Sequence, residues 1–260
     1  MNKVPGLEAS IRAKTTSQDA IQFVNSKGKA YATMKQTGDP NQQTLLSEYE
    51  IFRDDLSKIL HDLTKDNPNV DYVYGEQVSA IHQQSEKGKA TVEFQEGKLP
   101  TGEYDLVVAC DGATGRTRAI GLDCTVRAHI NPINMWSAYA SVKEDFLDGT
   151  QAGKMYGSLG GRAIGIGPDP SGGNRACAMA ILPRPSSTNE DATLPFRTAQ
   201  KQGDATLRQY VTDYFKGAGW ITEDVVAAMT ASPEFYASEW FQVKLPSIVN
   251  GTFASIRSCG

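Results

Sequence analysis

The sequence is short of the residues that build disulfide frameworks and metal centres. It has only four cysteines in 260 residues, and they are widely spaced: Cys110, Cys124, Cys177 and Cys259. No C-x-x-C pair occurs, and the three histidines show no ligand spacing. This pattern disfavours a zinc site or a disulfide scaffold and favours a reducing compartment. We therefore expect no metal centre and a cytoplasmic location.

Positive charge, long apolar runs and a leader-like start are also missing. Lys and Arg number 26 against 30 Asp and Glu, which gives a formal net charge of −4 at pH 7. Without a basic excess to meet phosphates, a nucleic-acid binder is disfavoured. No stretch is apolar for long enough to span a membrane, and residues 1–20 do not resemble a signal peptide. The remaining composition, 40% apolar and 22% charged, is that of an ordinary globular protein with one large or two small domains.

The first part of the chain predicts alternating helices and strands. The predicted elements are a helix over 4–14, strands over 20–24 and 29–34, a helix that runs to 63, and strands over 70–74, 77–83 and 89–94. Residues 25–28 have the composition of a hairpin turn. Ser47 precedes Glu50 by three residues, which predicts a capping box at the start of the second helix.

The segment Tyr104–Cys110 is a short apolar run that ends at Asp111-Gly112. A strand that is apolar on both faces is typical of a parallel sheet covered by helices. We therefore expect this strand to be buried, with the Asp-Gly turn at its carboxyl end, where α/β sheets place ligands.

From about residue 131 the pattern changes to short strands separated by Gly, Pro and Asp clusters. The predicted strands cover 135–142, 153–158, 161–167, 175–182 and 235–245, and the predicted helices cover 205–215 and 222–229. This order predicts a second, mainly antiparallel sheet.

Two segments, Ser47–Leu56 and Tyr104–Arg118, carry a resemblance to a known family. The first contains the pattern I-x-R-x-x-L from Ile51 to Leu56, and the second contains Asp-Gly directly after an apolar strand. In this order they resemble FAD-dependent (class A) monooxygenases of the p-hydroxybenzoate hydroxylase fold, in the branch with tetracycline-inactivating and fungal enzymes. The similarity continues to Gln242–Leu245, so it covers nearly the whole chain.

The resemblance implies a fold class of α/β (α+β) with two domains. Residues 1–130 are expected to form a partial, Rossmann-like FAD-binding domain with a hairpin insertion at about 20–45. Residues 131–246 are expected to form an antiparallel-sheet substrate domain. The resemblance stops near Pro246, so residues 247–260 are expected to be a divergent tail.

Two motifs of that family do not occur in these 260 residues. There is no G-x-G-x-x-G, whose amides and helix dipole bind the FAD pyrophosphate, and no Gly-Asp follows Gln242–Leu245. We therefore expect a form truncated at both ends, inactive or weak in FAD binding. A homo-oligomer or a partner chain would then cover the sheet edge beside Tyr104–Cys110.

By resemblance, Arg53, Asp111 and Gly112 are the cofactor-binding residues. A guanidinium at a helix start can contact polar flavin atoms or phosphate, and a glycine lets the backbone approach a cofactor closely. The alternatives are a solvated Arg53 paired with Asp54, Asp55 or Glu50, and simple turn chemistry at Asp111-Gly112.

Further candidates follow from the same resemblance. Arg116 and Arg118 are candidates for contacting the phosphates of NAD(P)H, or are surface charges. Strand residues whose aromatic and sulfur side chains suit a flat apolar substrate are Tyr139, Met155, Tyr156 and Met179. Core packing explains each of these four equally well. No catalytic acid, base or nucleophile stands out by spacing.

The function that the resemblance implies is monooxygenation. NAD(P)H would reduce FAD, and the reduced flavin would use O₂ to hydroxylate an aromatic or polyketide-like small molecule. The alternative is a non-redox protein derived from that fold, which binds a small molecule or a partner without flavin. A flavin halogenase is disfavoured because no W-x-W-x-I-P motif occurs.

Overall fold

The computed structural model describes residues 4–16, 18–35, 37, 46, 49–84, 88–183 and 191–255. The chain divides into two compact units, each built from two stretches of sequence. Unit 1 contains Met1–Val70 and Asn134–Glu239, and unit 2 contains Asp71–Ile133 and Trp240–Gly260. No helix among the described residues is long and apolar enough to cross a membrane.

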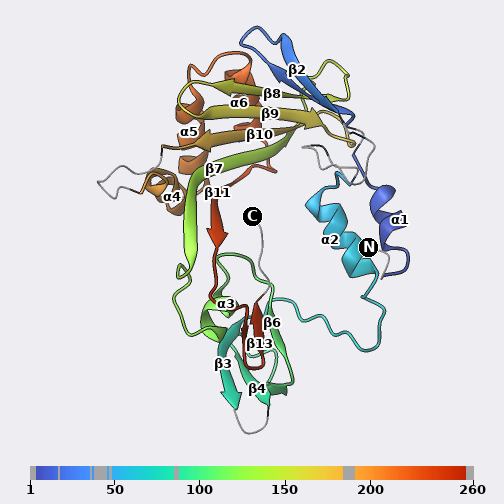
Figure 1. Cartoon of the computed structure of the whole chain (residues 1–260), viewed down its shortest axis with the longest axis vertical. Helices are drawn as coiled ribbons and strands as arrows, with labels where there is room; N and C mark the ends of the chain where they lie inside the picture. Colours follow the sequence, from blue (N-terminus) through green and yellow to red (C-terminus); the bar gives the residue numbers. More distant parts are fainter. Residues whose placement is uncertain are drawn as a thin grey trace. The chain divides into compact units, whose positions relative to one another are not determined.

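Unit 1 is organised around a seven-stranded sheet (Figure 1). The strand order is β11 (Tyr236–Val243), β7 (Ile130–Val142), β10 (Asn174–Ile181), β9 (Arg162–Pro168), β8 (Ala152–Ser158), β1 (Ala20–Val24) and β2 (Ala30–Lys35). The pairs β10–β7, β10–β9, β8–β9 and β1–β2 are antiparallel, and the pair β1–β8 is parallel. The predicted mainly antiparallel sheet is therefore confirmed.

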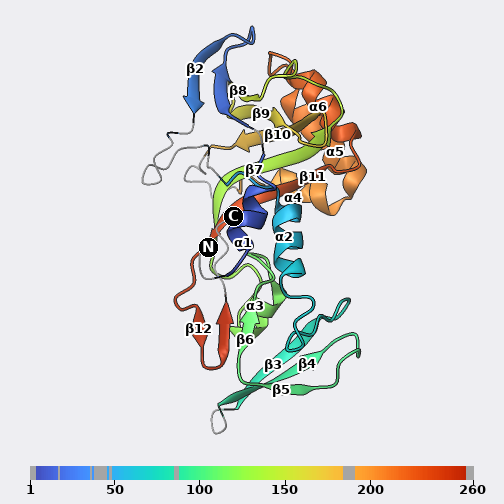
Figure 2. The same ribbon diagram turned by 90° about the vertical axis from the view of Figure 1, so that its right-hand side faces the viewer.

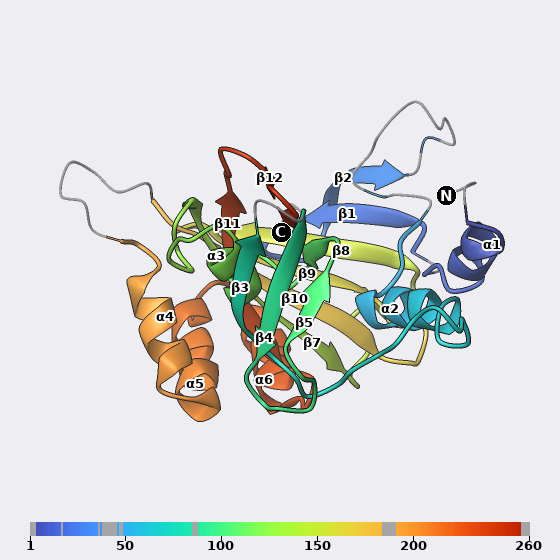
Figure 3. The same cartoon turned by 90° about the horizontal axis from the view of Figure 1, so that it is seen from below.

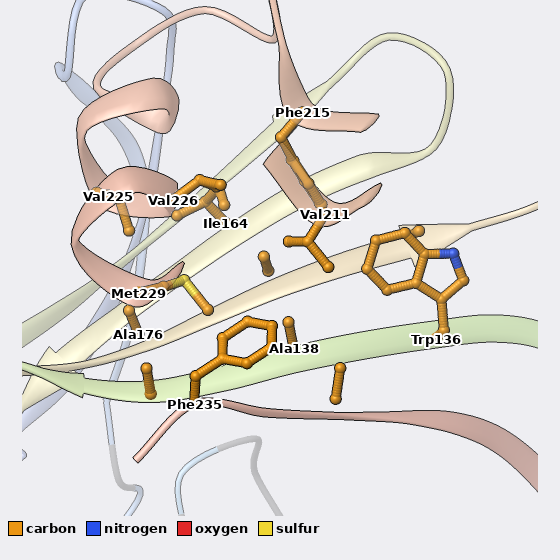
Figure 4. Packing of buried hydrophobic residues seen from close by; sticks show 14 of the residues in the cluster. Trp136, Ala138, Ile164, Ala176, Val211, Phe215, Val225, Val226, Met229 and Phe235 are labelled. Atoms are coloured by element: carbon orange, nitrogen blue, oxygen red, sulfur yellow. The ribbon is translucent and has the colours of Figure 1, made fainter. Parts of the chain in front are cut away.

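Three helices cover one face of this sheet: α4 (Leu194–Lys201), α5 (Asp204–Phe215) and α6 (Thr222–Ala231). In β7 the side chains alternate, so that Trp136, Ala138 and Ala140 all point into the core. Small alanines on the strands leave room for large helix side chains such as Phe215 and Met229 (Figure 4). All buried members of this core cluster belong to unit 1.

Two further helices of unit 1, α1 (Leu7–Arg12) and α2 (Arg53–Asp62), pack against each other (Figure 3). Helix α2 begins later than predicted, since its N-cap is Phe52 and no side chain caps it. Ser47 of the predicted capping box lies outside the described residues.

The hairpin β1–β2 changes the expected division of the chain. Its turn matches the prediction: Asn25 Oδ1 accepts hydrogen bonds from the amides of Lys27 and Lys29, at 2.9 and 3.1 Å. However, β1 pairs in parallel with β8, with Phe23 beside Met155, so the hairpin extends the sheet of the second half. Residues before 70 therefore belong with 134–239, whereas we predicted one domain over 1–130.

Unit 2 contains two small sheets and one helix. The first sheet has the order β3 (Val78–Gln84), β4 (Lys89–Phe94), β5 (Gly102–Tyr104), visible in Figure 2. The second has the order β12 (Val249–Asn250), β13 (Phe253–Ser255), β6 (Val107–Ala109), and the helix is α3 (Arg116–Gly121). The predicted divergent tail thus supplies β12 and β13, and β13 pairs in parallel with β6. No strand forms over the predicted segment 70–74.

The expectation of a buried strand over Tyr104–Cys110 is wrong for this structure. Leu106 is 58% exposed and Val108 is 43% exposed, and only Ala109 is buried. The reason is that β6 lies at the edge of its sheet, where β13 is its only neighbour among the described residues. Its apolar sequence therefore does not reflect burial on both faces.

Candidate functional site

A cavity of about 320 Å³ lies in unit 1, on the face of the sheet opposite α4, α5 and α6. The residues around it come from six strands of the sheet, from the segments before β1 and β11, and from the N-cap of α2. They are Gln18, Ile21, Phe52, Tyr139, Ala140, Gly153, Lys154, Met155, Gly165, Ile166, Gly167, Arg175, Ala176, Cys177, Glu234 and Tyr236.

Glycines form the floor of this cavity. Gly153 and Gly167 leave space for the Gln18 side chain, since a Cβ atom on Gly153 would lie 2.7 Å from Gln18 Nε2. A Cβ on Gly165 would lie 3.2 Å from the Met155 methyl group. Glycines inside strands commonly mark a close approach by another group. Here they keep the sheet surface hollow.

Aromatic and sulfur side chains form one wall. The rings of Tyr139 and Tyr236 stack with centroids 5.0 Å apart and an interplanar angle of 21°. Cys177 is the cross-strand partner of Tyr139, and Gly165 pairs with both Cys177 and Met155, so these residues form one row across the sheet. Such a wall offers flat apolar surface with polarizable sulfur, which suits a planar ligand.

The Tyr139 and Cys177 side chains are neutral at physiological pH. Burial raises the pKa of Tyr139 to about 12. Burial likewise raises the pKa of the Cys177 thiol to about 12, despite a hydrogen bond with Tyr139 that favours the thiolate. Nucleophilic cysteines need a lowered pKa, so the raised pKa of Cys177 favours a role in the cavity wall over a role as nucleophile.

Charge gathers at one end of the cavity, around Arg175. Its Nε atom is 2.8 Å from Asp169 Oδ2, and its Nη1 atom is 3.8 Å from Glu234 Oε2. The Arg175 guanidinium carbon lies 4.2 Å from the centroid of the Phe52 ring. Glu234 in turn accepts a hydrogen bond of 2.6 Å from the Ser141 hydroxyl.

The structure separates the four predicted substrate-pocket residues. Tyr139 and Met155 line the cavity, whereas Tyr156 and Met179 are not among its lining residues. Tyr156 follows Met155 directly on β8, so it points to the opposite face, where its hydroxyl donates to the Ala218 carbonyl at 3.0 Å. Met179 is on the same strand as Cys177 but lies two residues beyond it.

The lining residues that were not proposed from the sequence include Phe52, Arg175, Cys177 and Tyr236. The alternation of β10 provides a signal for two of them, because Arg175 and Cys177 must share a face if Ala176 is in the core. Phe52 and Tyr236 reach the cavity because of where α2 and β11 lie. The local sequence pattern does not predict those positions.

Arg53 is the first residue of α2, directly after the cavity residue Phe52. Its side chain is exposed, and no ion pair with another described residue is recorded for it. An exposed guanidinium agrees with the alternative of a solvated arginine, and its contact with a cofactor stays a prediction.

The Asp111-Gly112 corner belongs to unit 2 and precedes α3. Asp111 Oδ2 accepts a 2.7 Å hydrogen bond from the Thr117 amide, so the carboxylate orders the helix start. A Cβ at Gly115 would collide with the Asp111 carboxylate in its present position, so a larger residue there would displace that side chain. Gly112 has a φ of +81° and open space where a Cβ would be.

Arg116 and Arg118 differ sharply although both lie on α3. Arg116 is exposed and donates to Gln77 Oε1 at 3.1 Å. Arg118 is 2% exposed, and its Nη2 donates to the carbonyls of Ala113 and Val126 at 2.8 and 2.7 Å. Its guanidinium therefore holds the corner and the loop after α3 together.

Comparisons with known proteins agree on one family. A family model described as an FAD binding domain matches residues 3–222. Monooxygenase CTB7 of Cercospora beticola is 28% identical over 99% of this chain and 60% of that protein. FAD-dependent monooxygenase asL4 of Sarocladium schorii is 24% identical over 96% of this chain and 56% of that protein. The chain thus spans about 60% of the length of the relatives it matches.

Solved structures show the same fold. The crystal structure of tetracycline destructase Tet(51) superposes with a TM-score of 0.68 at 20% identity, covering 96% of this chain and 59% of that one. Klebsiella pneumoniae HpxO, solved in complex with FAD and uric acid, gives a TM-score of 0.63 at 18% identity, covering 93% of this chain and 56% of that one. The family model matches most of the length of the chain, and the curated relatives agree with it. The chain therefore belongs to the FAD-binding domain family of flavin-dependent monooxygenases.

Proposed function

We propose that this chain acts as an FAD-dependent monooxygenase, which uses NAD(P)H to hydroxylate an aromatic or polyketide-like small molecule. The observation that carries the proposal is the cavity of about 320 Å³ with its stacked Tyr139–Tyr236 wall. Its volume is within the range of small-molecule sites, and its apolar walls with few polar groups are typical of them.

Two of the proposed cofactor-binding residues, Gly112 and Arg53, have surroundings that are compatible with this proposal. Gly112 leaves open space at its Cβ position, so a ligand can approach the backbone there. Arg53 presents an exposed guanidinium free of ion pairs with described residues. FAD, when bound, would supply the redox chemistry. Arg53 of unit 1 would contact it through its guanidinium, and within unit 2 Asp111 would order the corner where Gly112 leaves the backbone accessible.

The cavity would hold the substrate. Tyr139, Tyr236 and Met155 would sandwich or flank a planar ring and exclude water from it. HpxO, a structural neighbour, was solved with uric acid, a flat heterocycle, which is compatible with such a site. For the electron donor, Arg116 is the better candidate of the two arginines, because the Arg118 donors are engaged with backbone carbonyls. The cytoplasmic location and a partner over the β6 edge remain predictions.

The test is an FAD titration of the full 260-residue chain, followed by flavin fluorescence and calorimetry. We expect weak binding, with a Kd above roughly 10 μM, because no phosphate-cradling glycine motif is present. Arg53→Gln should weaken binding by about tenfold, the effect of losing one charge-assisted contact. Lys58→Gln, on the same helix, is the matched control and should leave the Kd unchanged.

Flavin-loaded protein should then consume NADH or NADPH in the presence of O₂ and an aromatic acceptor. A tight stoichiometric complex would contradict the expected weakness. The absence of any fluorescence change at millimolar FAD would instead favour the non-redox alternative for this chain.

A further inference from the structure

We propose that Asn250 is a site of spontaneous deamidation, where the side-chain amide is converted with time to a carboxylate in a reaction that consumes only water. This inference goes beyond the proposed function, since it holds whether or not the chain binds flavin. It rests on the turn between β12 and β13 and on the contact that the Asn250 side chain makes within unit 2.

The pair Asn250-Gly251 is the single Asn-Gly sequence in the 260 residues. A following glycine favours deamidation, because no Cβ atom hinders the approach of its backbone nitrogen to the asparagine side chain. Asn250 ends β12 and pairs with Phe253, so Gly251 and Thr252 form a two-residue hairpin turn. The reactive sequence therefore lies at the tip of a hairpin.

The geometry of this turn explains why a glycine occupies position 251. Gly251 has a φ of +58°, a left-handed conformation that favours glycine. A Cβ atom there would also collide with Oε1 of Gln83, the atom that accepts a 3.1 Å hydrogen bond from the Thr252 amide. The turn thus requires the residue that makes Asn250 labile.

The groups that would react are accessible. Both Asn250 and Gly251 are exposed, and the Gly251 amide donates no hydrogen bond to any residue that the structure describes. The Nδ2 atom of Asn250, which would leave, donates to the Gly121 carbonyl at 3.3 Å. A hydrogen bond of this length restrains the side chain only weakly.

The reaction balances without an oxidant or a cofactor. The Gly251 nitrogen forms a bond to Cγ of Asn250 and closes a succinimide ring. The bond between Cγ and Nδ2 breaks, and Nδ2 leaves as ammonia with the proton that the Gly251 amide gives up. Water then opens the ring at one of its two carbonyl carbons. The product is an aspartate, or an isoaspartate that adds one carbon to the main chain.

Both products change the contact between the hairpin and α3. The donor to the Gly121 carbonyl, at the end of α3, is replaced by a carboxylate oxygen, which that carbonyl repels. An isoaspartate also disturbs the pairing with Phe253, whose buried ring packs at Gly121. Deamidation should therefore loosen α3 from β12 and β13.

The test incubates the full 260-residue chain at pH 6 and at pH 8 and follows it by peptide mass spectrometry and an isoaspartate-specific methyltransferase assay. Asn250 should convert several-fold faster at pH 8, because the attacking nitrogen must lose its proton. Asn25 is the internal control: it is exposed in the β1–β2 turn but is followed by Ser26, so it should convert several-fold more slowly. Asn250→Gln should abolish the reaction, since the longer side chain closes a ring far more slowly.

Two further variants connect the chemistry to the structure. Gln83→Ala releases the Thr252 amide from its acceptor and should speed the conversion of Asn250 several-fold. Asn250→Asp carries one product from the start, and its amide hydrogen exchange in α3 should be several-fold faster, as in the converted wild type. An intact position 250 after weeks at pH 8, conversion no faster than that of Asn25, or unchanged exchange in α3 after conversion would overturn the proposal.

Discussion

Arg118 shows at the scale of one residue why a charged side chain near a nucleotide-binding motif need not face a ligand. It is buried, and it donates to the carbonyls of Ala113, Val126 and, at 3.5 Å, Ala128. These bonds join the turn before α3 to the loop after it. The side chain therefore supports the Asp111-Gly112 corner from behind.

Replacing Arg118 should lower the free energy of unfolding more than replacing the exposed Arg116. Arg118→Met leaves partly buried carbonyls without their donor and removes a buried charge-assisted network, so we expect the free energy of unfolding to fall by about 3 kcal/mol. Arg116→Gln, at the exposed position two residues earlier, should change it by less than about 0.5 kcal/mol. Urea unfolding followed by circular dichroism measures both. An unchanged midpoint in Arg118→Met would mean that its hydrogen bonds are dispensable.

The residues that sequence reasoning found and missed differ in a simple physical way. Tyr139 and Met155 could be predicted from the sequence, because strand alternation and side-chain type are local properties. Including both Met155 and Tyr156 conflicted with that same alternation, since neighbours on a strand point to opposite faces. The alternation of β10 indicates the face on which Arg175 lies, but its contacts with Asp169 and Phe52 could not be predicted, because those residues come from other segments.

At the scale of elements, α5 and α6 are tied together by Arg208. Its Nη1 atom donates to the Thr230 and Ser232 carbonyls at 2.6 and 2.8 Å, at the end of α6. The guanidinium also lies over the Phe235 ring, 4.6 Å from its centroid. One side chain thus satisfies carbonyls that the helix terminus leaves open and packs on the segment that leads into β11.

We expect Arg208→Met to destabilise unit 1 by about 2 kcal/mol, because two carbonyls and a cation–π contact lose their partner. The control is Asp204→Asn, which removes only the ion pair of Arg208 with a carboxylate that is 66% exposed. Exposed pairs contribute about 0–1 kcal/mol, so the control should unfold close to the wild type. Thermal unfolding compares the two, and equal losses would assign the effect to the ion pair.

Most elements of the seven-stranded sheet were predictable, and the exceptions have physical reasons. The predicted strands agree with β8, β9 and β10, because alternating residues and flanking glycines define these strands locally. The helix α4 was missed, since eight residues that begin with Leu-Pro give little periodic signal. The burial of β6 was predicted wrongly because an apolar edge strand and a central strand look alike in sequence.

At the scale of the whole molecule, each unit has a core made of its own residues. The unit 1 cluster contains Phe215 and its neighbours from 134–239. In unit 2, Phe253 is fully buried, and its ring fills the space where any side chain at Gly121 would be. The same two stretches are joined by Asn250 Nδ2, which donates to the Gly121 carbonyl at 3.3 Å. Residues late in the chain therefore complete a unit that begins at residue 71.

This division predicts separable stability, testable with one substitution in each core. Phe253→Ala should cost about 3–5 kcal/mol and accelerate amide hydrogen exchange in β3, β4 and β6, while β8, β9 and β10 keep their protection. Phe215→Ala, the matched change in unit 1, should give the reverse pattern, because its ring is buried among α5, α6 and the sheet. Exchange measured by mass spectrometry resolves these segments. If each variant exposed all strands to the same degree, the two units would form one cooperative structure, and the separate cores would not act as independent sources of stability.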